Sequence, residues 1–171
     1  MWEKLKLTVG IVWASPITLL AFIFYIAPMW VLRQYRYAGW HGIAWRWDYI
    51  VRSNPDLKTK FDKFVDEKWH CWNGAAMGNI ITIKVYKGSH ESITVTHEHE
   101  HVIQCMRLGV FQPIFYVLYW MLARFVLRHA DVYYDSPFEI DARRAADQLI
   151  DVPGTVKRIK ELAAAKKDQQ P

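Results

Sequence analysis

The chain has 171 residues, of which 52% are hydrophobic and 15% aromatic, and it carries a net charge of +5. This length suits one compact domain. The high aromatic content, together with 23% charged residues, indicates a folded body with a polar surface that is joined to an apolar segment. The mild charge, with no dense block of Lys and Arg, argues against nucleic acid as a partner and favours anionic lipid head groups or an ordinary solvated surface.

The first feature in chain order is a run without charged residues from Leu7 to Leu32. It exceeds the roughly 20 apolar residues that a helix needs to cross a bilayer. Pro16 and Pro28 would bend or end this helix. We therefore expect a single-pass membrane anchor over residues 1–36, with a cleaved signal peptide or a helix docked on the protein as alternatives. Three basic residues follow the run and lean the rest of the chain slightly toward the cytoplasmic face: Arg33, Arg36 and Arg46.

Residues 37–53 are dense in Trp and Gly and predict an aromatic interfacial linker, although packing of the same rings in a core is equally compatible with the pattern. Residues 54–171 make up the predicted metal-binding domain. Its first helix starts at Asn54-Pro55, and Ile80–Tyr86 predicts an edge strand. A helix from about Glu91 to Leu108 follows, and Gly109 ends it.

The apolar stretch over residues 110–128 is uninterrupted only from Pro113 to Ala123, which is short for a membrane span. It predicts a buried or interfacial, membrane-proximal helix. A loop and another helix, Phe138–Ile150, come next, and Pro153 opens a last helix. These elements predict an α+β fold that is mostly helical. Two cysteines, Cys71 and Cys105, form no CxxC pair, which leaves free thiols or one disulfide open.

The residues that point to chemistry lie in the segment Thr96-His97-Glu98-His99-Glu100-His101-Val102. His97-Glu98-x-x-His101 fits the HExxH pattern, and positions i and i+4 of a helix share one face, so both imidazoles can reach one ion. Zinc with three protein ligands keeps one position for water. Glu98 can border that position and take a proton from the water as the catalytic base.

A β-strand is the alternative for this segment, because His97, His99 and His101 also alternate with period 2 and would then all be ligands. We favour the helix, since Val95, Val102 and Met106 form a stripe at helical spacing. On a helix His99 points about 200° away from His97 and cannot join the site.

A carboxylate near the start of the next predicted helix, in Ser136-Pro137-Phe138-Glu139-Ile140-Asp141-Ala142, completes the pattern. Strand, HExxH helix and a later helix bearing a Glu resemble the zincin fold in its gluzincin form. Glu139-Ile140-Asp141-Ala142 resembles the E-x-E-A-D type signature of membrane-embedded zinc endopeptidases. The resemblance covers about Ile80 to Ala146 and includes small uncharacterised bacterial and phage proteins. It implies a zincin-like core with a short edge strand or hairpin, and Glu139 as the third ligand of one zinc ion.

Two positions depart from the family pattern. Glu100 stands where a small residue often precedes the second His, and Arg143 stands where many relatives have an Asp four residues after the third ligand. Asp141 or Asp147 can then orient a ligand histidine, and the residues expected next to the ligands are Asp141, Arg143 and Tyr134. Tyr133 and Tyr134 are further candidates for stabilising an oxyanion.

The pattern as a whole predicts a membrane-anchored zinc metallopeptidase that hydrolyses a peptide or protein substrate through water activated by Glu98. The alternative is a zincin-shaped, metal-binding membrane protein without peptidase activity, with a role in binding or assembly. Arg143 keeps this alternative open.

Overall fold

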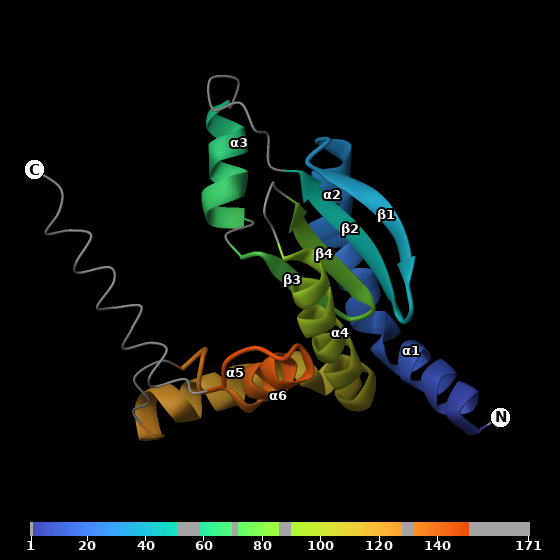
Figure 1. Cartoon of the computed structure of the whole chain (residues 1–171), viewed down its shortest axis with the longest axis vertical. Coiled ribbons are helices and arrows are strands. Elements are labelled where there is room, and N and C mark those ends of the chain that lie inside the picture. Colours follow the sequence, from blue (N-terminus) through green and yellow to red (C-terminus); the bar gives the residue numbers. More distant parts are fainter. Residues whose placement is uncertain (1, 51–58, 70–71, 86–89, 128–131, 151–171) are drawn as a thin grey trace, which may run out of the picture.

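The computed structural model describes residues 2–50, 59–69, 72–85, 90–127 and 132–150 (Figure 1). The fold is α+β and mostly helical, as predicted, and it contains a small mixed sheet. The predicted helix start at Asn54-Pro55, the last helix from Pro153 and Cys71 lie outside the described residues. Cys105 is a buried, free thiol.

An apolar helical rod opens the chain. Helix α1 (Trp2–Ala21) continues through a π-helical turn, η1 (Phe22–Ile26), into α2 (Ala27–Val31). In the turn the N–H of Ala27 donates to the carbonyl of Phe22, a local widening that suits the proline at position 28, which has no N–H and crowds the preceding turn. The rod is long and apolar enough to cross a membrane, by length and composition.

The inner face of this rod packs on the rest of the protein. Ala21, Ile26 and Met29 are buried in a cluster with Trp47 and Ile80 of the sheet. A polar contact adds to it, because the backbone N–H of Asn79 donates to the Thr18 hydroxyl at 2.9 Å. The rod is therefore one layer of the domain. The boundary predicted at residue 36, at the end of the anchor, does not separate two parts that pack independently.

The sheet has the strand order β1–β2–β4–β3. Strands β1 (Tyr35–His41) and β2 (Ala44–Ile50) form an antiparallel hairpin, and β2 pairs in parallel with β4 (Ile80–Val85). In the described residues 37–50 of the predicted linker the chain thus forms strands, which fits the alternative of aromatic rings packed in a core. Aromatic residues at alternate positions explain this packing, because Trp47 and Tyr49 share one face of β2 and are 7% and 2% exposed against the helical rod.

Strand β4 lies inside the sheet, which corrects its prediction as an edge strand. Ile80 faces the helical rod, whereas Ile81 packs with Val102 of the next helix, so both faces of β4 are covered. The edge position belongs to β3 (Gly74–Met77), which pairs antiparallel with β4. The parallel partner β2 comes from the segment predicted as a linker, so the sequence pattern could not indicate it.

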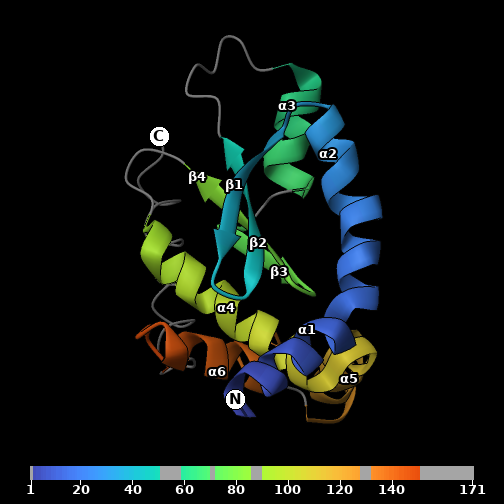
Figure 2. The same ribbon diagram turned by 90° about the vertical axis from the view of Figure 1, so that its right-hand side faces the viewer.

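The second helical layer is α4 (Glu91–Leu108), with the bounds predicted from the sequence. Gly109 follows it with a φ of 58°, a left-handed conformation in which glycine avoids strain. The helical assignment excludes the alternative strand for His97–His101. In Figure 2, α4 and the N-terminal rod lie on opposite sides of the sheet.

The remaining described elements are helical. A 3₁₀ turn, η4 (Gly109–Phe111), leads into α5 (Gln112–Met121) and the π-helical η5 (Leu122–Leu127). Helix α6 (Pro137–Ala145) then lies beside α4, and it ends before the predicted Ile150. Between β2 and β3, the short α3 (Lys60–Phe64) continues into η3 (Val65–Trp69).

Candidate metal centre

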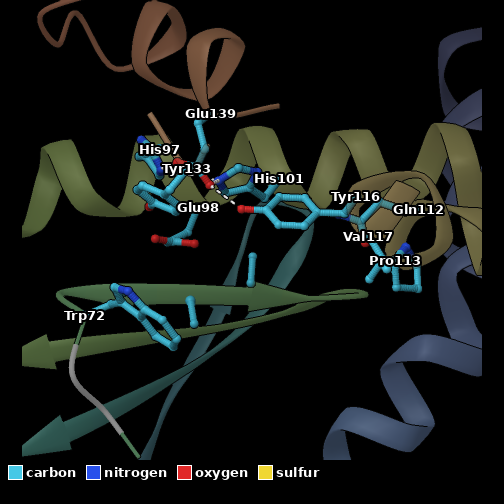
Figure 3. Close-up of a pocket in the computed structure, with 13 residues that line it drawn as sticks. Trp72, His97, Glu98, His101, Gln112, Pro113, Tyr116, Val117, Tyr133 and Glu139 are labelled. Carbon is cyan, nitrogen blue, oxygen red and sulfur yellow. Dashed lines mark hydrogen bonds and ion pairs between the residues drawn. The ribbon is translucent and has the colours of Figure 1, made fainter. Parts of the chain in front are cut away.

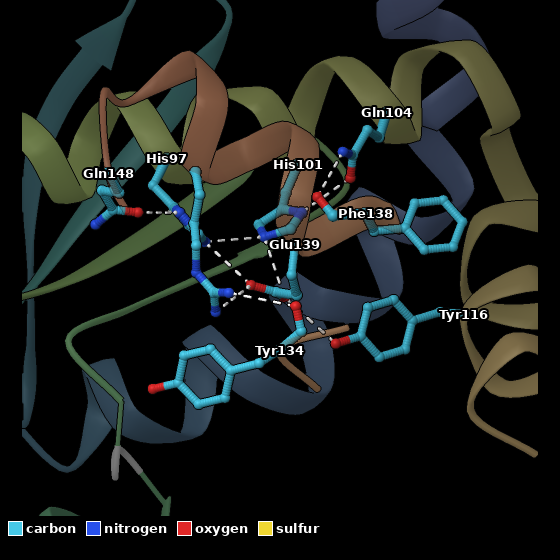
Figure 4. A network of polar contacts seen from close by, with 9 residues as sticks. His97, His101, Gln104, Tyr116, Tyr134, Phe138, Glu139 and Gln148 are labelled. Atoms are coloured by element: carbon cyan, nitrogen blue, oxygen red, sulfur yellow. Dashed lines mark hydrogen bonds and ion pairs between the residues drawn. The ribbon is translucent and has the colours of Figure 1, made fainter. Parts of the chain in front are cut away.

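The three side chains predicted as metal ligands converge on one point. The Nε2 atoms of His97 and His101 are 3.2 Å apart. Each of them lies 3.4 Å from one carboxylate oxygen of Glu139 (Figure 4). One ligand atom from each residue falls within 4.8 Å of the others, a cluster able to hold a metal ion.

Local helix geometry accounts for this convergence. His97 and His101 are one turn apart on the buried face of α4. Glu139 belongs to the first turn of α6, behind Ser136 as N-cap and Pro137 as the first helical residue. The helix dipole favours a carboxylate there, and α6 lies across α4 so that the carboxylate meets the imidazoles.

Two glutamines orient the imidazoles. Nδ1 of His101 donates to Gln104 Oε1 at 2.9 Å, and Nδ1 of His97 donates to Gln148 Oε1 at 2.9 Å. Because the amide nitrogen of Gln104 also donates to the carbonyl of Phe138 at 2.9 Å, the orientation of that amide is defined. With Nδ1 protonated, the Nε2 lone pairs point to the shared centre, as metal ligands require.

A helix-ending turn brings Gln148 to the site. The N–H of Gln148 donates to the carbonyl of Arg143 at 2.9 Å, and Asp147 between them has a φ of 51°. This is a Schellman motif, which reverses the chain after α6. The prediction that Asp141 lies next to the ligands is wrong, because it is on the exposed side of α6 and pairs with Arg144 at 3.2 Å.

The electrostatics of the ligands fit a cation site. Burial opposes ionisation of Glu139, but contacts with His101 and His97 outweigh it and hold the pKa of this carboxyl well below its usual range. Burial likewise works against a charged His101, and Glu139 overcomes it, so the pKa of His101 is raised. Glu139 is thus an ionised carboxylate that faces the imidazole nitrogens of His97 and His101 in a largely buried environment.

Glu98 lies beside the ligands and is 5% exposed. Burial raises its pKa to about 7, against the opposing effects of His101 and His97. Its carboxylate occupies the space left by Gly74 of β3, because a Cβ at Gly74 would come within 2.6 Å of Glu98 Oε1. The side chain therefore reaches the site only because β3 carries no side chain there.

A pocket of about 320 Å³ opens on these residues (Figure 3). Its walls come from β3, α4, the start of α5 and the first turn of α6. Tyr116 reaches in from α5, and its hydroxyl donates to Glu139 Oε1 at 3.4 Å. Sequence reasoning missed Tyr116. The sequence pattern that could have indicated it is that Tyr116 shares one face of an otherwise apolar helix with Gln112 and Tyr119.

Arg143 lies next to Glu139, and Tyr134 contacts Arg143. The guanidinium of Arg143 is 4.1 Å from the ring centre of Tyr134 and 5.7 Å from that of Tyr133. Its Nη2 lies 4.0 Å from Glu139 Oε2. Tyr133 lines the pocket, and burial together with Glu139 raises its pKa. Arg143 thus places a cation beside the third candidate ligand.

His99 points away from the centre, as the helix predicts. Its ring lies 6.5 Å from the ring of His41 on β1. The candidate centre therefore consists of two imidazoles and one carboxylate, a donor set typical of zinc sites that keep an open position. No family model, curated protein or solved structure matches the chain.

Proposed function

We propose that the protein is a membrane-anchored zinc metallopeptidase with a zincin-like core. The observation that supports this most is the convergence of His97, His101 and Glu139 beside a buried second carboxylate, Glu98. Two nitrogen donors, one carboxylate donor and an adjacent base are the components of metal-assisted hydrolysis. The apolar N-terminal rod, long enough to span a bilayer, supports the anchor.

Each residue has a defined part in this reaction. His97, His101 and Glu139 would hold zinc, which when bound supplies a Lewis acid that polarises a carbonyl and acidifies water. Glu98 takes the proton from the attacking water and later passes it to the leaving amine. A buried carboxylate beside the ligands is placed to accept this proton and to release it again.

The substrate would bind along the edge of the sheet. Gly74, Ala75 and Ala76 of β3 line the pocket, and β3 is the edge strand. An extended peptide can pair with such an edge through main-chain hydrogen bonds. Strand β4 (Ile80–Val85) cannot accept such a peptide, because it is already paired with β2 and β3.

A metal-binding protein without peptidase activity is the second candidate. The observation that favours it is the buried cation of Arg143, 4.0 Å from Glu139 Oε2. A cation at this distance competes electrostatically with a metal ion for the same carboxylate. Binding or assembly would then be the function of the site.

The substitution Glu98→Gln separates the two candidates. The purified chain is loaded with zinc and incubated with a broad peptide library, with and without a chelator. We expect cleavage by the unsubstituted protein and by Glu100→Gln, a control on the same helix, and no cleavage by Glu98→Gln with full zinc content. Hydrolysis retained in Glu98→Gln would contradict the mechanism, and a zinc-loaded wild-type protein that cleaves no peptide would favour the second candidate.

A further inference from the structure

In the helix formed by α5 and η5, the polar side chains other than the exposed Arg124 lie on the protein side, and the apolar side chains lie mainly outside. Gln112, Tyr116 and Tyr119 are half-buried and Ala123 is fully buried, at spacings that fall on one helix face. The Tyr116 hydroxyl donates to Glu139 and the Tyr119 hydroxyl donates to the carbonyl of Asp135 at 2.7 Å. These hydroxyl groups are thus used inside the molecule.

The outward face of the same helix is apolar along its length. Side chains between 46% and 67% exposed on this face include Ile114, Val117, Leu118, Leu122, Phe125 and Val126. A helix on the surface of a water-soluble protein has the opposite arrangement, with its apolar stripe inward. Large apolar patches of this kind mark a surface that another phase or molecule covers.

This face is continuous with the outer face of α1. The rings of Trp13 and Phe111 have centres 6.4 Å apart, and those of Phe111 and Phe115 are also 6.4 Å apart. All three rings are nearly half exposed, so they form an aromatic row that joins the two helices on the outside. In Figures 1 and 2 the N-terminal part of α1 and α5 are both at the lower end of the molecule, and η4 contacts α1 there. Val9 and Val12 of α1, 57% and 65% exposed, extend the surface.

We propose that a lipid bilayer covers this surface, so that α5 and η5 form a second membrane-embedded element beside α1. Apart from Arg124 near the end, the side chains of α5–η5 that do not face the protein are apolar, as lipid contact requires, whereas a protein interface has a polar rim. Helices α5 and η5 have 10 and 6 residues. At 1.5 Å per residue they reach about 24 Å, less than the roughly 30 Å hydrocarbon core. The whole helical stretch Glu91–Leu127 is long and apolar enough to cross a membrane by length and composition. Its α4 part packs on β3, β4 and α6, so only α5 and η5 are free to enter the membrane, and they do so without crossing it. Arg124 near their end can extend to the head groups.

The position of the pocket follows from this arrangement. Val117 and Pro113 line the pocket and are also exposed on the apolar face of α5. The mouth of the pocket then opens at the lipid surface, next to Glu139 and Tyr116. This inference goes beyond the proposed function, because it holds whether or not Glu98 is a catalytic base.

Spin labels on the full chain test the inference. Single cysteines are placed at Leu118 and Phe125, and at Val12 and Asp141 as references, in a background with Cys71→Ser and Cys105→Ala. The proteins are reconstituted into vesicles of phosphatidylcholine and phosphatidylglycerol, and collisions with oxygen and with a water-soluble nickel chelate are measured. We expect labels at Leu118 and Phe125 to collide more with oxygen than with nickel, like Val12, and the label at Asp141 to show the reverse.

Two outcomes would overturn the proposal. Nickel-dominated collisions at Leu118 and Phe125 would mean that water covers the face. Exclusion of both reagents, with spin–spin broadening that disappears on dilution with unlabelled protein, would mean that a second copy covers it. The unsubstituted chain provides an independent measurement, because a photoactivatable phosphatidylcholine should crosslink to residues 112–127 and not to α6. Crosslinks confined to α1 would also contradict the second membrane-embedded element.

Discussion

Gln104 holds the ring of His101 in place and at the same time joins the two helices that carry the candidate ligands. Its amide oxygen accepts from His101 Nδ1, and its amide nitrogen donates to the carbonyl of Phe138, each at 2.9 Å. Phe138 immediately precedes Glu139 in the chain. One side chain therefore sets both the orientation of a ligand imidazole and the position of the ligand carboxylate relative to it.

Replacing Gln104 should weaken metal binding without removing a ligand. In Gln104→Leu, His101 loses its hydrogen-bond acceptor and α6 loses a contact with α4, so we expect zinc affinity to fall by about 10- to 100-fold. Competition with a chromophoric chelator measures the affinity. Arg107→Gln, at an exposed position on the same helix, should bind zinc like the unsubstituted chain. Unchanged affinity in Gln104→Leu would exclude the orienting role.

The ligand set predicts opposite results for two histidines on α4. Zinc at 100 times its dissociation constant should raise the free energy of unfolding by about 2.7 kcal/mol, because it binds only the folded chain. His101→Ala should abolish this gain, whereas His99→Ala should keep it, since His99 faces His41. Thermal unfolding in detergent, with each variant compared with its own metal-free form, measures the gain. The assignment would be contradicted if zinc no longer stabilised His99→Ala but still stabilised His101→Ala.

Gly74→Ala should disturb Glu98 more than the metal ligands. The new Cβ would lie 2.6 Å from Glu98 Oε1 and 2.8 Å from Thr94 Cγ2, so the glutamate or the strand must move. Overpacking of this kind costs about 1–3 kcal/mol of stability. We expect a lower unfolding midpoint and a loss of peptide hydrolysis, with zinc still bound. Replacing Glu98 by Ala in the same chain should restore part of the stability, and a destabilisation of equal size in both backgrounds would show that Glu98 is not the clashing group.

The buried carboxyl of Glu98 predicts a pH-dependent stability for the metal-free protein. Its pKa rises from 4.5 in the unfolded chain to about 7 in the fold, because of burial. The folded state therefore binds this proton more tightly, and the resulting stability is complete below pH 4.5 and is lost as the pH rises through about 7. Glu98→Gln removes this loss. The free energy of unfolding of the variant, relative to that of the unsubstituted chain, should therefore increase between pH 4.5 and about pH 7, by at most about 3 kcal/mol.

Denaturant unfolding at a series of pH values, in the presence of a chelator, measures this difference. The Gln variant serves as a matched control, because it keeps the size and shape of the side chain and removes its charge. Parallel stability curves for the two proteins would contradict the raised pKa of Glu98.

The local pattern of the sequence determined the main helix and the residues on its buried face. The spacing of His97 and His101, the apolar stripe with Val102 and the stop at Gly109 all express one helical period, which depends only on neighbours in the chain. The structure confirms the helix over Glu91–Leu108. The carboxylate of Glu139 meets the two imidazoles, although the sequence indicated it only through family likeness.

Tertiary structure alone decided the rest. The place of β4 inside the sheet depends on its parallel pairing with β2, and Trp45, Trp47 and Tyr49 could have suited a membrane interface as well as a core. Gln148 is 51 residues from His97 and reaches it only because α6 ends in a left-handed turn at Asp147. Contacts between residues so far apart in the chain depend on how helices and strands pack, and that packing leaves no periodic signal in the sequence.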